Sequence, residues 1–355
     1  MLKRVFTAGL LLCLSNAMAA APQAEVDKLG GSLTPLGGER AGNAAGSIPA
    51  WDGGITQAPT GYAGAGRHHV DPFPDDKPLF TITSANLQQY QAQLTAGQVA
   101  LFKAYPDSFS MPVYQSRRTA SAPQWVYDNT RRNAAQAHLL KDGNGFADAY
   151  AGIPFPIPQR GVEALWNHIA RYRGIYVVRQ SSDASVQRNG SYGLVTLRQE
   201  ALFNYYQARS ASELNNILFY FLAETKSPAR LAGGALVVQE TLDQVAQARQ
   251  AWAYAAGQRR VRRAPNVAYD TPLGTADNLM TADDKDMFNG APDRYDWQLL
   301  GKREIFIPYN NYRLSSPDVQ YAQLIRAGHL EPAYTRYELH RVWVVPHHPA
   351  PSRFQ

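Results

Sequence analysis

The sequence QAWAYAAGQRRVRRAPNVAYDTP, residues 250–272, is the stretch that decides the fold. Trp252 and Tyr254 alternate with alanines, and Gly257 interrupts this pattern before a run of arginines. Pro265 follows, and proline is poorly tolerated inside a helix. Alternation in size bounded by glycine and proline is typical of two strands joined by a turn. The stretch therefore predicts an antiparallel hairpin whose aromatic and arginine side chains indicate a binding protein before an enzyme.

The arginines of this hairpin are candidates for binding an anionic head group or a partner. On a continuous strand, Arg260 and Arg262 would share one face, and Arg259, Val261 and Arg263 the other. Guanidinium groups bind carboxylates and phosphates bidentately, which suits the mouth of a ligand cavity. A solvated strand face with cross-strand acidic partners is the alternative. The sequence leaves both interpretations open.

Regularly spaced β-rich segments fill residues 175–345, and short amphipathic helices are expected mostly in residues 85–172. Alternating strand and helix units are not seen, which argues against a nucleotide-binding α/β fold. The predicted fold class is α+β, mainly β: a curved antiparallel sheet, or incomplete β-barrel, with short helices covering an apolar cavity. Residues 95–106, 124–140 and 161–172 are predicted helices, the last with its apolar side chains on one face.

The predicted strand ILFYFLA, residues 217–223, is apolar on both faces and must therefore be covered twice. Helices could pack on both faces. Alternatively, one face could line a cavity for an acyl chain, with the helices of residues 85–172 as its lid. The residues predicted to line this cavity are Ile217, Phe219, Phe221, Leu236, Val238, Trp252, Tyr254 and Trp297.

The N-terminus has the pattern of an export signal. Lys3 and Arg4 precede an apolar run, and Ala17-Met18-Ala19 fits signal peptidase cleavage after Ala19. Cys13, the single cysteine, lies within the predicted leader and is preceded by Leu12, which disfavours lipidation. The remaining chain would have neither disulfides nor thiolate chemistry, and the periplasm is the predicted location.

Composition predicts a folded and mildly basic protein. Hydrophobic residues make up 45% of the chain, enough for a sizeable core. Loss of Lys3 and Arg4 with the leader would lower the formal net charge of +6 by two. A mild basic bias suits anionic lipids or acidic partners, whereas nucleic acid is a poor candidate for an exported chain. Residues 20–80, rich in glycine and proline, are expected to form an irregular arm.

No motif in the chain nominates a catalytic, metal or cofactor site. A Gly-Lys-Ser/Thr phosphate loop and a Gly-x-Ser-x-Gly elbow are both missing from the sequence. The pairs His68-His69 and His347-His348 would point to opposite faces of a strand, so they do not form a chelate. Asp283-Asp284-Lys285-Asp286 is better explained as the start of a helix after Thr281 than as a calcium loop. We therefore expect no enzyme activity, no cofactor and no metal.

Several segments together resemble the domain-of-unknown-function 1329 (DUF1329) family, which is often labelled outer-membrane lipoprotein-sorting-protein-like and grouped with the LolA/LolB superfamily. The matching segments are residues 33–35, 39–43, 48–51, 76–80, 257–265, 286–290, 302–304 and 308–310. The resemblance implies an incomplete antiparallel β-barrel with helices plugging an apolar cavity that holds a lipid or acyl chain. It also implies partners in envelope transport: an inner-membrane exporter and an outer-membrane protein.

Compared with that family, the chain ends early, so part of the C-terminal sheet is expected to be missing. The predicted organisation is a signal peptide (1–19), an arm (20–80), one lipoprotein-carrier-like domain (81–345) and an irregular tail (346–355). The leading hypothesis is a periplasmic, non-enzymatic carrier or chaperone for a lipid-like ligand. The alternatives are an interaction module of an envelope export assembly without its own ligand and, third, a glycan binder. No transmembrane segment is expected in the mature chain.

Overall fold

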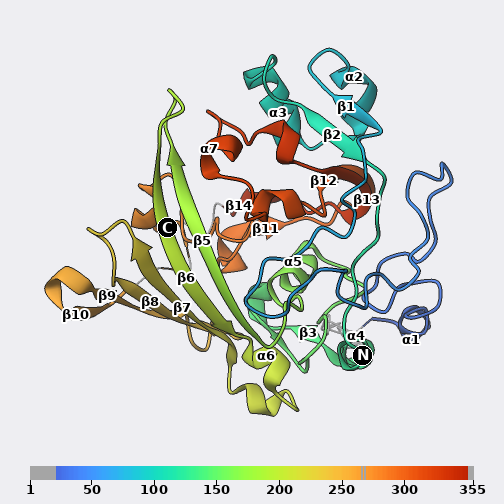
Figure 1. The fold of residues 1–355 in the computed structure, drawn as a ribbon. Helices are drawn as coiled ribbons and strands as arrows, with labels where there is room; N and C mark the ends of the chain where they lie inside the picture. Colours follow the sequence, from blue (N-terminus) through green and yellow to red (C-terminus); the bar gives the residue numbers. More distant parts are fainter. Residues whose placement is uncertain (1–20, 265–266, 268, 351–355) are drawn as a thin grey trace, which may run out of the picture.

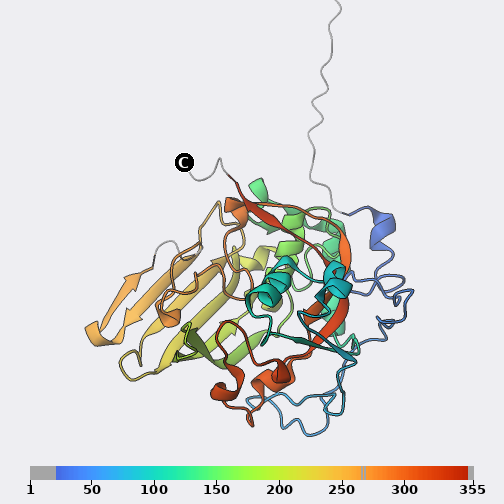
Figure 2. The same ribbon diagram turned by 90° about the horizontal axis from the view of Figure 1, so that it is seen from above.

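The computed structural model describes residues 21–264, 267 and 269–350. The predicted leader, its cleavage site and Pro265 lie outside the described residues. The described chain is mainly β-structure, with antiparallel sheets and a few short helices (Figure 1). Seen along the perpendicular axis, the arm formed by residues 21–80 lies on the opposite side of the molecule from the β9–β10 hairpin, which carries residues 250–263 (Figure 2).

The larger sheet, here called the pocket sheet, is an antiparallel meander in the order β10-β9-β8-β7-β6-β5. Its strands are β5 (Tyr176–Val186), β6 (Tyr192–Leu202), β7 (Ile217–Ser227), β8 (Ala235–Thr241), β9 (Gln250–Ala255) and β10 (Arg260–Arg263). Each strand pairs with its neighbour in sequence, and β5 and β10 are the two edges. Within the described residues the sheet is therefore open and does not close into a barrel.

The hairpin predicted from residues 250–272 is confirmed. Strand β9 passes through the 3₁₀ turn Ala256–Gln258 into β10, with Arg263 opposite Trp252 and Arg260 opposite Ala255. Arg259 has φ 49°, a left-handed conformation, so it belongs to the turn and does not share a strand face with Val261 and Arg263. The arginine run is thus divided between a turn and a strand.

The smaller main sheet, here called the network sheet, has the order β1-β2-β13-β12. It consists of β1 (Phe80–Ile82), β2 (Met111–Tyr114), β12 (Lys302–Pro308) and β13 (Tyr337–Trp343), with β13 and β2 parallel. Two-stranded sheets pair β3 (His138–Leu139) with β4 (Phe146–Ala147), and β11 (Tyr295–Trp297) with β14 (His347–Pro349). The tail of residues 346–355 was expected to be irregular, and this expectation is wrong for His347–Pro349, which form β14. A strand at the edge of a sheet tolerates proline.

The main helices follow the predicted patterns. They are α3 (Ala96–Ala104), α4 (Gln124–Gln136) and α5 (Gly161–Ile169), and the single-turn helices are α1 (Gln23–Val26), α2 (Leu87–Tyr90), α6 (Asn204–Gln207) and α7 (Tyr321–Leu324). Thr95 and Gln98 form the predicted capping box at the start of α3. Helix α5 buries Val162, Leu165, Trp166 and Ile169, as its spacing predicted. The helix predicted after Thr281 is wrong: Thr281, Asp283 and Asp284 form a hydrogen-bonded turn instead.

Two apolar cores support the two sheets. One surrounds Trp166, Phe146 and Tyr205 and includes Leu218 and Phe219 at the start of β7. The other packs Phe102, Met111 and Ile82 beneath the network sheet. The expectation that β7 is covered on both faces is confirmed at its start, where Leu218 and Phe219 are both buried, and wrong further along, where Tyr220 is 38% exposed. Beyond the start of β7, the outer face of the pocket sheet is partly exposed to solvent, and Val237 on β8 is 40% exposed.

Candidate ligand-binding pocket

A pocket of about 1190 Å³ lies against the inner face of the pocket sheet. This volume is slightly above the range of roughly 300–1,000 Å³ that is typical of small-molecule sites. Strands β5 to β8 form one wall, and residues 267–289 form much of the opposite wall. The alternation of side chains along each strand decides which of them reach the pocket.

The centre of the pocket wall is apolar because cross-strand neighbours present the same kind of side chain to the inner face. One row runs across three strands through Ala201, Phe221 and Val238, and the next row contributes Ala223 and Leu236. Phe219 and Leu197 extend this surface. Loop residues on the other side add Val267, Pro272 and Leu273. Such a surface suits an apolar ligand body.

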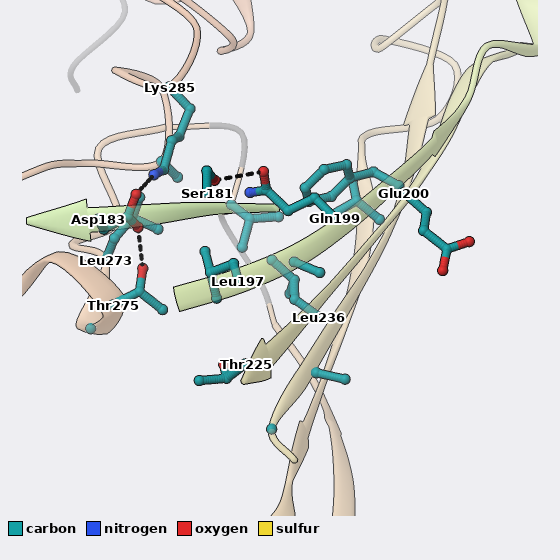
Figure 3. Close-up of a pocket in the computed structure, with 18 of the residues that line it drawn as sticks. Ser181, Asp183, Leu197, Gln199, Glu200, Thr225, Leu236, Leu273, Thr275 and Lys285 are labelled. Atoms are coloured by element: carbon teal, nitrogen blue, oxygen red, sulfur yellow. Dashed lines mark hydrogen bonds and ion pairs between the residues drawn. The ribbon is translucent and has the colours of Figure 1, made fainter. Parts of the chain in front are cut away.

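Polar side chains gather along β5 at one side of the pocket (Figure 3). Asp183 accepts a hydrogen bond from Thr275 Oγ1 at 3.0 Å and is paired with Lys285 Nζ at 2.7 Å. Ser181 donates to Gln199 Oε1 at 3.2 Å. Glu200 points to the other face of the sheet, as strand alternation requires (Figure 3).

Arg179 lies on β5 beside Ser181 and Asp183, and its positive charge has no acidic partner in the described part of the chain. Its Nε donates to Gln199 Oε1 at 2.8 Å. Among the described residues, no acidic side chain forms an ion pair with Arg179. The pocket therefore combines an apolar centre with a cationic group along β5.

Asp286 connects the loop wall to the end of α5. Its carboxylate lies 2.7 Å from an Arg171 nitrogen and 2.6 Å from an Arg173 nitrogen. Burial disfavours the ionised form, but hydrogen bonds and charge from Arg171 and Arg173 outweigh it, so the pKa of Asp286 is lowered. Asp286 remains ionised at neutral pH and links the loop to the segment between α5 and β5.

A second ion pair ties the loop to β8. The Arg249 guanidinium lies 2.5 Å from Glu240, and the two side chains are 4% and 2% exposed. Arg249 also donates to the backbone oxygens of Val267 and Asn289 at 2.7 and 2.6 Å. Removal of one partner of a buried ion pair leaves the other charge buried and uncompensated, which strongly destabilises the folded protein. Arg249 therefore helps to fix the pocket wall.

Five of the eight predicted cavity residues border this pocket: Phe219, Phe221, Leu236 and Val238 from the inner face, and Tyr254 at the end next to the hairpin turn, although its register places it on the same outer face as Trp252. Trp252 does not, because it lies opposite Val237 and Arg263 on the outer face of the sheet. Ile217 does not either, since it precedes an irregularity in the β7–β8 pairing. Trp297 packs on Phe288 and His347 and donates to Pro292 O, away from the pocket.

The four candidate arginines of the hairpin do not line the pocket. Arg259, Arg260, Arg262 and Arg263 are all exposed on the turn and on the edge strand β10. Register places Arg262 opposite Ala253 and in the same cross-strand row as Leu236, so it lies on the inner face but beyond the pocket wall. The structure thus separates the arginine run from the apolar centre.

The polar residues of the pocket were missed by sequence reasoning. Arg179, Ser181 and Asp183 alternate along β5, which is the pattern of a strand with a polar inner face. That signal was present, but polar residues on a strand are usually assigned to its solvent face. The prediction that the helices of residues 85–172 form the lid is wrong, because none of their residues lines the pocket. Residues 267–289 cover it instead.

The carboxylates of the pocket are not arranged as an acid and base pair. Asp183, Glu240 and Asp286 are each paired with a lysine or arginine. A glycosidase-type pair needs one carboxyl group with a raised pKa, and that of Asp286 is lowered.

Within the described part of the chain, no cluster of three or more metal-ligating side chains is found. Likewise, none of its helices combines the length and apolar character that membrane crossing requires.

The open antiparallel sheets and the few short helices define a mainly β protein, and a large, mainly apolar pocket lies against its larger sheet. The family model described as protein of unknown function (DUF1329) matches residues 81–354. The chain belongs to the DUF1329 family, as the sequence motifs predicted. It is 50% identical over 337 residues to the uncharacterized protein PA3922 of Pseudomonas aeruginosa, a match that covers 95% of this chain and 74% of that protein.

Two solved structures show weaker similarity. A DUF1329 family protein from Desulfovibrio piger is 17% identical, with 41% of this chain and 57% of that chain covered and a TM-score of 0.29. A putative outer membrane lipoprotein-sorting protein domain from Vibrio parahaemolyticus is 12% identical, with 54% and 72% covered and a TM-score of 0.31. These scores are too low for either structure to indicate the function of this chain.

Proposed function

We propose that this protein is a periplasmic, non-enzymatic carrier of a lipid-like amphiphile and that it binds its ligand in the pocket of the larger sheet. The observation that carries the proposal is the division of the pocket into an apolar centre and a polar β5 side. Phe219, Phe221 and Val238 would contact the apolar body of the ligand. Burial of such a chain is favourable in proportion to the apolar area removed from water.

The ligand's head group is anionic in this proposal. Arg179 lies in the same cross-strand row as Ala223 and Leu236, so its guanidinium borders the apolar surface. It has the capacity to bind a carboxylate or phosphate, because no acidic side chain among the described residues is paired with it. Gln199, which accepts from Arg179 Nε, would hold the guanidinium in place.

Native mass spectrometry of the full chain purified from periplasm, followed by lipid extraction, tests the proposal. We expect a bound lipid in the purified protein, or stoichiometric uptake of a fatty acid or phosphatidylglycerol by the delipidated protein. Consistent absence of both would refute the carrier function. Arg179→Gln should weaken binding of a fatty acid by about tenfold, the scale of one lost charge-assisted interaction, and weaken a neutral fatty alcohol far less.

A matched pair of variants locates the ligand. Leu236→Trp would fill the pocket, and Val237→Trp places the same side chain on the outer face of the same strand. We expect the first variant to lose lipid binding and the second to retain it, with thermal unfolding used to check that both are folded. Ala223→Leu is a milder pocket-filling change if the tryptophan variant does not fold.

The exposed arginine strand β10 favours a second candidate function, an interaction module of an envelope export assembly that needs no ligand of its own. An inner-membrane exporter and an outer-membrane protein would be its partners. In that case Leu236→Trp would leave transport by the assembly intact in cells, whereas replacing the hairpin arginines would abolish it. The carrier proposal predicts instead that Leu236→Trp abolishes transport.

A further inference from the structure

The β9–β10 hairpin forms the end of the pocket sheet farthest from the arm of residues 21–80 (Figures 1 and 2). Between Asp243 and Asp270 the chain contains five arginines and no acidic residue. Arg249 is buried against Glu240, and the other four are Arg259, Arg260, Arg262 and Arg263. The tip of the molecule therefore carries a concentrated positive charge.

These four cations are not neutralised within the protein. All four are exposed, and among the described residues their side chains make a single hydrogen bond, from Arg262 to Gln258 Oε1 at 2.9 Å within the same hairpin. Among the described residues, no carboxylate lies within ion-pair distance of them, although elsewhere on the protein Arg326 and Arg341 have such partners. The interpretation of cross-strand pairs with acids is therefore wrong for this strand.

Apolar and aromatic side chains lie between these cations. Val261 is 64% exposed and directly opposite Tyr254, which is 38% exposed. Arg263 is opposite Trp252, which in turn is opposite Val237. Tryptophan, tyrosine and arginine are the residues that concentrate at the interface between a bilayer and water.

We infer that the β9–β10 hairpin docks this protein on an anionic lipid bilayer, with Val261 and Tyr254 at the level of the head groups and the four arginines among the phosphates. The charge of the hairpin is complementary to an anionic leaflet, which attracts exposed basic residues near its surface. This inference does not depend on what the pocket holds.

The distribution of the arginines favours a bilayer over a protein partner. Register places Arg260 and Arg262 on the inner face of β10, Arg263 on the outer face and Arg259 in the turn. A folded partner would contact one face of this projecting strand and leave the other arginines in water. Mobile lipid head groups can surround the tip on every side, so all four cations gain anionic partners.

The same hairpin borders the pocket. Tyr254, Ala255, Ala256 and Gly257 line one end of it, next to the β7–β8 turn. Docking by the hairpin would bring this end of the pocket to the membrane surface. A ligand could then leave the bilayer, or return to it, over a short path.

Vesicle flotation of the delipidated full chain tests the inference. We expect binding to vesicles that contain phosphatidylglycerol in phosphatidylcholine, weak binding to phosphatidylcholine alone, and release by salt. Replacing Arg259, Arg260, Arg262 and Arg263 together by glutamine should weaken binding on the order of a hundredfold, given the contribution of each basic residue near a charged leaflet. Val261→Ser should weaken it further at high salt, where the apolar contact dominates.

A control of equal charge separates this site from general basicity. Arg67, Arg188, Arg209 and Arg303 are exposed elsewhere on the protein, and their joint replacement by glutamine removes the same number of charges. We expect this variant to bind vesicles nearly as well as the unaltered protein. Similar losses in the two fourfold variants, or equal binding to neutral and anionic vesicles, would overturn the inference.

Two further outcomes are decisive. If the unaltered protein ignores every vesicle but its hairpin arginines are required to capture an acidic peptide, the hairpin is a protein-docking site and the membrane assignment is wrong. Leu236→Trp, which blocks the pocket, should dock on vesicles like the unaltered protein. Failure of the lipid-carrier proposal would therefore leave this test unaffected. Thermal unfolding of each variant checks that lost binding is not lost folding.

Discussion

The pocket sheet and the network sheet use polar residues in different ways. In the network sheet, Glu338 is fully buried and accepts from Arg336 Nε at 2.7 Å and from the backbone nitrogen of Arg117 at 2.7 Å. His340 Nε2 and Asn310 Nδ2 each form a further hydrogen bond of 3.0 Å with the Glu338 carboxylate. In the pocket sheet, one face borders a large cavity and the other is exposed. One region is stabilised by a satisfied polar network, and the other keeps surface available for a ligand.

Two of the family motif segments in the N-terminal arm, residues 39–43 and 76–80, contact the network sheet and not the pocket. Asp76, in a motif segment, binds Arg117 and Arg336 at 2.7 and 2.8 Å. Glu39, in another, pairs with Lys302 and Arg341, and Asn43 donates to Glu304. These segments attach the N-terminal arm to the network sheet. The motif segment of residues 286–290 differs, because Asp286 and Asn289 line the pocket.

The largest predicted effect removes the centre of the network. Glu338→Gln removes the carboxylate that Arg336 and His340 share and leaves Arg336 with Asp76 alone. Loss of one partner of a buried pair costs about 3–5 kcal/mol. Urea denaturation should show this decrease in the free energy of unfolding. The control is Glu224→Gln on the outer face of the pocket sheet, whose exposed pair with Lys226 is expected to contribute less than about 1 kcal/mol. Equal losses would contradict the comparison.

A second prediction contrasts two glycines. Gly37 has φ +91°, and a Cβ there would lie 1.9 Å from Pro156 O, so Gly37→Ala requires the arm to move. Backbone strain and overpacking together predict a loss of about 2–3 kcal/mol. Gly257 in the hairpin has no neighbour within 4 Å of a Cβ, so Gly257→Ala should change stability by less than about 1 kcal/mol. Thermal unfolding of both variants would measure the difference, and a tolerated Gly37→Ala would show that the arm is loosely attached.

The sequence predicted the elements of the pocket sheet better than its surroundings. Alternation at Trp252 and Tyr254 identified β9, and the apolar inner face was recognised through Phe219, Phe221, Leu236 and Val238. The parallel pairing of β2 with β13 joins residues more than two hundred positions apart, and no local pattern encodes it. The loop cover of residues 267–289 is held by distant ion pairs such as Asp183 with Lys285. Those contacts depend on tertiary packing, which periodicity cannot predict.

Acid should weaken the network sheet. Hydrogen bonds from Arg117 are the main cause of the lowered pKa of Asp76, and hydrogen bonds to Glu338 outweigh its burial and lower its pKa as well. Because both pKa values are lower in the folded state, the unfolded chain takes up protons first as the pH falls below the ordinary values of 4.5 for Glu and 3.8 for Asp. The free energy of unfolding should then decrease by up to about 1.4 kcal/mol per pH unit for each group.

Chemical denaturation at a series of pH values between neutrality and mild acid measures this dependence. Glu338→Gln should make the curve less steep in the acidic range, since one of the titrating groups is removed. The stabilisation is fully present above the ordinary pKa values and is lost only as the pH passes through the lower folded values. A variant curve as steep as that of the unaltered protein would show that Glu338 is not among the groups responsible.

The smallest effect compares two adjacent residues of β8. Val238 faces the pocket and is 8% exposed, whereas Val237 faces solvent and is 40% exposed. Val238→Thr places a hydroxyl group on the apolar wall and should cost about 1 kcal/mol, whereas Val237→Thr should change the free energy of unfolding by less than about 0.5 kcal/mol. Urea denaturation would resolve the two. If both substitutions were neutral, the pocket wall would already be hydrated, and the proposed binding of an apolar chain would lose its driving force.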